Sequence, residues 1–195
     1  MTKAWMRTIP GLVVVAAVVG TTHQLAGQQP ATHDHSPAAA AAELAASRRR
    51  FSPGLEMMRS LAGRWEGTTF REREGTTTAV VTYALTGAGS AVIETLFPGT
   101  VREMTTVYHD DSSGRLVAQH FCNAANQPRL RLMESQENRL YFVLAPDADI
   151  KADLEGHAHE LTLLLGVDGS LSHDWLNHYL GRPGQQRNIQ LRKVK

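Results

Sequence analysis

The feature that most constrains this chain is an alternation of apolar and polar residues that begins at Trp65 and runs almost to the C-terminus. A period of two is typical of β-strands that bury one face. Short runs of turn residues, such as Gly87-Ala88-Gly89 and Arg182-Pro183-Gly184, separate ten such segments. The predicted strands are about 64–71, 77–85, 90–97, 102–109, 115–122, 128–135, 138–144, 157–165, 170–180 and 186–194.

The connections between these segments are mostly a few residues long, which favours antiparallel hairpins between neighbours. One longer connection, Ala145 to Gly156, has a pattern that allows a helical turn at Ile150 to Leu154. A sheet of this kind removes both of its edges by closing on itself. We therefore expect a mainly β protein, an antiparallel up-and-down β-barrel of about 8–10 strands, with a two-layer sandwich as the alternative.

A short helix is predicted immediately before the first strand. Ser52-Pro53 suits a helix N-terminus, because serine caps the first turn and proline fits the first helical position. Leu55, Met58 and Leu61 recur at helical spacing, and Gly63 is a typical helix end. One apolar stripe on a short helix suits a plug for one end of a barrel.

The first 27 residues resemble a secretory leader. Lys3 and Arg7 give a positive start, and Gly11 to Gly20 is an apolar run too short to span a bilayer. We expect an exported protein, periplasmic or extracellular, with no membrane span after cleavage.

Residues 28–50 are rich in alanine and proline and are predicted to be a flexible linker that includes His33-Asp34-His35. Residues 51–195 are then the barrel domain. The chain has 20 basic and 19 acidic residues and a formal charge of +1, without a basic stripe, which argues against a nucleic-acid partner. Cys122 is the only cysteine, so an intramolecular disulfide is excluded.

The sequence Gly63-Arg64-Trp65 after a short helix resembles the start of a lipocalin or of another calycin. Leu85 to Gly99, Met104 to His109 and His120 to Arg129 resemble a group of exported, uncharacterised bacterial proteins with a lipocalin-like domain. The resemblance implies structural roles for Gly63, Trp65 and Arg192, with the arginine packed over the indole in a cation–π contact. It implies the fold and export, and it names no ligand.

Several polar and aromatic side chains fall on rows that contain enough apolar residues to face the barrel interior. A small, partly apolar molecule bound in the lumen would contact them. These candidate ligand-binding residues are Glu94, Tyr108, His120, Asn126, His157, His159 and Trp175.

Two alternatives use the same interior. In one, an enzyme has Glu94 as acid and His120 or His157 as base. In the other, His120 and Cys122 join His157 and His159 in a site for zinc or copper. The chain has no nucleophile elbow, phosphate-binding glycine loop or Cys-x-x-Cys motif. The sequence therefore favours a small-molecule binding protein over an enzyme, and we assign no catalytic residue, metal ligand or cofactor.

Overall fold

The computed structural model describes residues 36, 51–71 and 74–194. The helix and the strands all lie in one compact unit, Arg48–Lys195. Ten strands form a closed barrel in which each pairs antiparallel with its neighbours in sequence, and β1 pairs with β10. The predicted up-and-down barrel is confirmed. The predicted leader, residues 1–27, and linker, residues 28–50, lie outside the described residues apart from Ser36.

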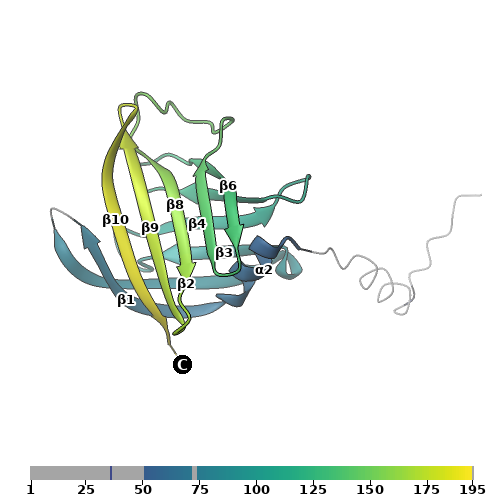
Figure 1. The fold of residues 1–195 in the computed structure, drawn as a ribbon. Helices are drawn as coiled ribbons and strands as arrows, with labels where there is room; N and C mark the ends of the chain where they lie inside the picture. Colours follow the sequence, from purple (N-terminus) through teal and green to yellow (C-terminus); the bar gives the residue numbers. More distant parts are fainter. Residues whose placement is uncertain (1–35, 37–50, 72–73, 195) are drawn as a thin grey trace, which may run out of the picture. The chain divides into compact units, whose positions relative to one another are not determined.

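The strands follow one helix and run around the barrel in chain order (Figure 1). The elements are α2 (Pro53–Ser60), β1 (Gly63–Arg71), β2 (Gly75–Thr86), η1 (Gly87–Gly89), β3 (Ala91–Leu96), β4 (Met104–Asp110), β5 (Leu116–Phe121), β6 (Arg129–Gln136), β7 (Arg139–Leu144), β8 (His157–Leu165), β9 (Ser170–Tyr179) and β10 (Arg182–Lys193). All ten predicted strands are present, with ends that differ by a few residues.

A β-bulge in β8 changes the residues that face the interior. Ala158 pairs with Asn177, but the next paired residue, Glu160, lies opposite Leu176. One extra residue, His159, is therefore inserted between these two pairs. The predicted inward position of His159 is wrong, because the bulge gives Ala158 that place; His157 is buried, as expected of an inward residue.

Helix α2 covers the end of the barrel where β1 begins. The Ser52 hydroxyl accepts the Leu55 N–H and caps the helix. The carboxylate of Asp110, at the end of β4, accepts bonds of 2.8 and 2.6 Å from the backbone N–H and hydroxyl of Ser52. The cap is thus joined to the sheet, and the buried Leu55 and Met58 fill the barrel end beneath it.

Trp65 closes the same end, but its cationic neighbour is not the expected one. Its indole N–H donates to the Leu61 carbonyl at 2.7 Å, and Lys193 Nζ lies 5.7 Å from the ring centre. Arg192 pairs with Glu66 on the outer face and binds Asp168 at 2.7 Å. The expected Arg192–Trp65 contact is wrong because alternation turns position 193, not 192, toward the inside.

The long connection 145–156 contains a turn, in which Leu154 N–H bonds to Lys151 O, and no α-helix. Within the described residues, no helix has the length and apolar character needed to cross a bilayer.

Candidate functional site

A cavity of about 360 Å³ lies at the end of the barrel opposite α2. It is lined by Arg71 at the end of β1, Met104 at the start of β4, and His120 near the end of β5. In an antiparallel meander these positions meet at one end, the end away from Gly63 and the helix. Trp175 and Met104 give the wall an apolar part, and its volume lies in the lower range for small-molecule sites.

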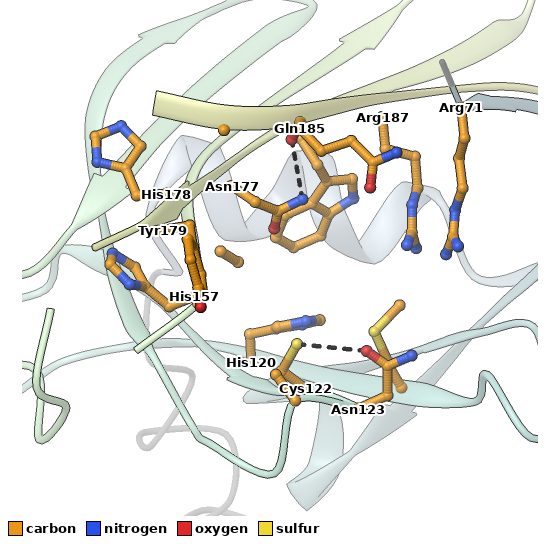
Figure 2. Close-up of a pocket in the computed structure, with 16 residues that line it drawn as sticks. Arg71, His120, Cys122, Asn123, His157, Asn177, His178, Tyr179, Gln185 and Arg187 are labelled. Carbon is orange, nitrogen blue, oxygen red and sulfur yellow. Dashed lines mark hydrogen bonds between the residues drawn. The ribbon is translucent and has the colours of Figure 1, made fainter. Parts of the chain in front are cut away.

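Two guanidinium groups stand side by side on one wall (Figure 2). Arg71 and Arg187 are direct partners across β1 and β10, and both line the cavity. Burial, followed by the charge of Arg71, lowers the pKa of Arg187 to about 10. Arg187 nevertheless remains cationic near neutral pH, so the wall carries two adjacent guanidinium groups.

The carboxylate nearby does not balance these charges. Glu74 binds Arg71 at 2.8 Å and, through its other oxygen, Arg102 at 2.8 Å. Arg187 has no carboxylate within ion-pair distance among the described residues, and its guanidinium lies 5.6 Å from the Phe97 ring centre. The Nε of Arg71 is buried without an acceptor in that same set. Both arginines thus have unused donor capacity at the cavity wall.

His120 lines the cavity, and its side chain is 2 % exposed. Its Nδ1 lies 2.9 Å from the Thr106 hydroxyl, and its ring is 4.8 Å from that of Trp175. Burial first, and then the charge of Arg187, lower the pKa of His120 to about 4. The imidazole is therefore neutral at neutral pH and adds polarity to the cavity without charge.

Deeper in the barrel, Glu94 is fully buried in a hydrogen-bonded cluster. The hydroxyls of Tyr83 and Tyr108 donate to its two oxygens at 3.0 and 2.8 Å. His173, from the opposite side of the barrel, places Nε2 2.8 Å from the Tyr83 hydroxyl. Burial raises the pKa of Glu94 to about 7, although the hydroxyls of Tyr108, Tyr83 and Thr106 oppose it. Burial lowers the pKa of His173 to about 3.

This cluster does not match the acid–base pair of the enzyme alternative, Glu94 with His120 or His157. The histidine beside Glu94 is His173, whereas His120 binds Thr106 and His157 binds the backbone of Glu155. Neither Glu94 nor His173 lines the cavity, and both are 0 % exposed. A group sealed from the cavity cannot exchange a proton with a substrate there, so the cluster fills the barrel middle as a polar core.

Three histidines meet at the rim of the cavity, on β8 and β9. His157 Nε2 lies 3.1 Å from His159 Nδ1. The rings of His159 and His178 are stacked, with 3.5 Å between their centres. Burial, then the neighbouring histidines, lower the pKa values of His159 and His178. The grouping with His120 and Cys122, which the metal-binding alternative required, does not form: the cluster that the structure brings together contains His178 instead.

The seven predicted lumen residues thus divide into four groups. His120, His157 and Trp175 line the cavity, while Glu94 and Tyr108 lie in the buried cluster. His159 stacks on His178. Asn126 donates to Gly156 O at 2.9 Å and fixes the connection 145–156. Several residues of the cavity and of the buried cluster were not predicted as site residues from the sequence, namely Arg71, Arg187, Asn177, Met104, Tyr83 and His173.

No protein-family model matches the sequence, and no curated protein matches it. Among solved structures, the chain is similar to a DUF3598-family protein of unknown function from Nostoc punctiforme. The TM-score is 0.46 at 12% identity, over 70% of this chain and 49% of that one, so the chain spans about half of that protein's length. It is also similar to a redesigned β-barrel, with a TM-score of 0.33 at 10% identity over 74% and 96% of the two chains.

Proposed function

We propose that this protein binds a small organic anion, a carboxylate with an apolar body, in the cavity at the open end of the barrel. The observation that carries the proposal is the pair Arg71 and Arg187, which are adjacent on the cavity wall. Glu74, the nearby carboxylate, binds Arg71 and Arg102 and forms no ion pair with Arg187. A guanidinium fork matches a carboxylate in shape and charge.

The buried Nε of Arg71 strengthens the case for an anion. An unsatisfied buried N–H costs on the order of 1–3 kcal/mol, and more when the group is charged. A carboxylate bound between the two arginines would supply an acceptor to this N–H and a counter-charge to Arg187. The protein alone provides neither among the described residues.

The rest of the cavity supports an apolar body for the ligand. The indole of Trp175 and the side chain of Met104 offer dispersion contacts, and Asn177 and neutral His120 offer a few polar ones. Mixed walls of this kind suit a molecule with one charged end. A metabolite that is charged all round would leave the indole and thioether without an apolar partner.

We also propose that the barrel is related to lipocalin-like barrels and that the protein is exported. The relationship is supported by the helix that plugs one end, the Gly-x-Trp at the start of β1 and the closed meander. Ten strands exceed the eight of a lipocalin, and Lys193 rather than Arg192 meets the tryptophan. Fractionation of expressing cells, with the mass of the mature chain, tests export: removal of about the first 27 residues is expected, and a full-length cytoplasmic product would contradict it.

Binding is tested by calorimetry with two probes that share an apolar body, phenylbutyrate and phenylbutanol. The wild type is expected to bind the carboxylate at least about tenfold more tightly than the alcohol, because a charge-assisted pair contributes more than a neutral bond. R187M should abolish this preference. R192M, on the outer face of the same strand, should retain it. Equal affinity for the two probes in the wild type would refute an anion site.

A further inference from the structure

The bulge in β8 assembles a second polar cluster, distinct from the arginine pair. His157 is the direct partner of His178 across β8 and β9, and the inserted His159 stacks on His178 with ring planes 3° apart. One nitrogen from each ring lies within 4.8 Å of the others. Without the inserted residue, the side chains of positions 157 and 159 would be separated along the strand by the rise of two residues, roughly 7 Å.

The hydrogen bonds of His157 fix its tautomer. Its Nδ1 lies 2.9 Å from the Glu155 carbonyl, which can only accept, so Nδ1 carries the proton. Its Nε2 then has a free lone pair. A backbone carbonyl that holds the outer N–H of a histidine is the usual support of a metal-binding imidazole. His157 is 2 % exposed and therefore held in this orientation.

The lone pair of His157 faces another ring nitrogen. His157 Nε2 and His159 Nδ1 are 3.1 Å apart. Two nitrogens bound to the same tetrahedral zinc ion at about 2.0–2.1 Å lie roughly 3.4 Å apart, so this pair is close to the edge of such a site. In the metal-free protein, the contact is an N–H···N bond donated by His159 Nδ1. When an ion replaces that proton, the neutral His159 ring carries its proton on Nε2 instead.

His178 supplies the third nitrogen after a small movement. Lone pairs of parallel stacked rings point along parallel planes and cannot meet at one ion, so the stack of His159 and His178 must open. Both rings are partly exposed, and a rotation about χ2 is enough to tilt them.

We propose that His157, His159 and His178 bind one divalent transition-metal ion, with zinc as the first choice, at the rim of the cavity. Three imidazoles suit zinc or copper and disfavour magnesium or calcium, which require oxygen ligands. They leave a fourth position for water or an anion. Figure 2 shows His157 and His178 on the side of the cavity opposite Arg71 and Arg187. Metal binding therefore does not depend on the proposed anion site.

The test is a calorimetric titration of the full chain with Zn²⁺. His33 and His35 form a separate His-x-His pair, so the titration uses the H33A/H35A background. One equivalent of zinc is expected to bind, whereas Mg²⁺ gives no heat. H159A and H178A should each weaken binding by at least about tenfold. Both side chains are partly exposed, so neither variant removes a core residue, and circular dichroism verifies the fold.

The matched control is H109A, a partly exposed histidine on β4 outside the cluster, which should bind zinc as the parent does. Binding below about a tenth of an equivalent, or affinity unchanged in both H159A and H178A, would overturn the proposal. R187M separates the two sites: it should abolish carboxylate preference and leave zinc affinity unchanged.

Discussion

Glu94 Oε1 lies 3.4 Å from Nδ1 of His173, and both residues are completely buried. The distance is within ion-pair range, but the geometry forms no hydrogen bond, and His173 Nδ1 has no partner among the described residues. The Tyr83 hydroxyl donates its proton to Glu94, so its oxygen accepts from the Nε2–H of His173. The Nδ1 of His173 then carries a lone pair, which faces the Glu94 carboxyl. This arrangement favours a neutral acid beside a neutral imidazole, because burial penalises both charged forms.

The first prediction concerns E94Q and its dependence on pH. Unfolded Glu94 ionises near 4.5, whereas the folded carboxyl keeps its proton until about pH 7. The wild type therefore loses stability relative to E94Q as the pH rises through this window, by about 3 kcal/mol at most. Urea denaturation of both proteins at pH 4.5, 6 and 8 measures the difference.

E137Q is the control for this comparison, since Glu137 is exposed in the turn between β6 and β7. Its difference from the wild type should stay flat with pH. A wild type that gains stability over E94Q as the pH rises would instead indicate a buried ion pair between Glu94 and a protonated His173.

The second prediction is a loss of stability on acidification. His120 and His173 have folded pKa values of about 4 and about 3, below the ordinary 6.5, so the unfolded chain binds more protons between pH 6.5 and 4. Each histidine contributes stability above pH 6.5 that is lost at about 1.4 kcal/mol per pH unit as the pH falls. Glu94 acts in the opposite direction, but two histidines outweigh one carboxyl.

Unfolding free energies at pH 5 and 6.5 check this balance. The wild type should be less stable at pH 5, and H173Q should show a smaller slope even if it is less stable throughout. A slope that is identical in the two proteins would mean that folding leaves the proton affinity of His173 unchanged, and it would contradict the lowering of its pKa by burial.

The sequence predicted the strands because alternation and turn chemistry are local. Gly63 and Trp65 indicated the start of the first strand, and Ser52 indicated the start of the helix. Helix caps and helix-ending glycines also depend only on neighbouring residues. Closure of the barrel by β1 and β10 followed from the need to cover two edges.

The site was predicted less well because its residues meet only through register. Arg71 and Arg187 are 116 positions apart and become neighbours by the pairing of β1 with β10. A single inserted residue in β8 removed His159 from the inward row, and no turn residue in the strand indicates that bulge. Glu94 was placed inside correctly, but its partner His173 comes from across the barrel.

The third prediction compares K193A with R192A. Lys193 packs over Trp65 at the closed end, whereas Arg192 binds Asp168 on the surface. K193A should lower the free energy of unfolding by about 0.5–1 kcal/mol, and R192A should have the smaller effect. Thermal denaturation gives the ranking. If R192A were the more damaging variant, Arg192 rather than Lys193 would be the cation that supports the tryptophan.

The last prediction is that removal of Arg187 stabilises the empty protein while it removes anion binding. Arg187 is partly buried beside Arg71 and has no carboxylate partner among the described residues, so the folded state bears both desolvation and like-charge repulsion. Methionine keeps most of the apolar stem and loses the charge. R187M should therefore be more stable than the wild type by about 1 kcal/mol without ligand, because protein binding sites are commonly retained at a cost in stability.

The measurement is urea denaturation with and without phenylbutyrate. The ligand should raise the midpoint of the wild type, since it binds only the folded state, and should leave that of R187M unchanged. R192M, which removes an outward arginine from the same strand, should keep the ligand effect. If R187M were less stable than the wild type without ligand, Arg187 would be part of the structural core, and its charge would then be balanced by the protein itself rather than reserved for an anion.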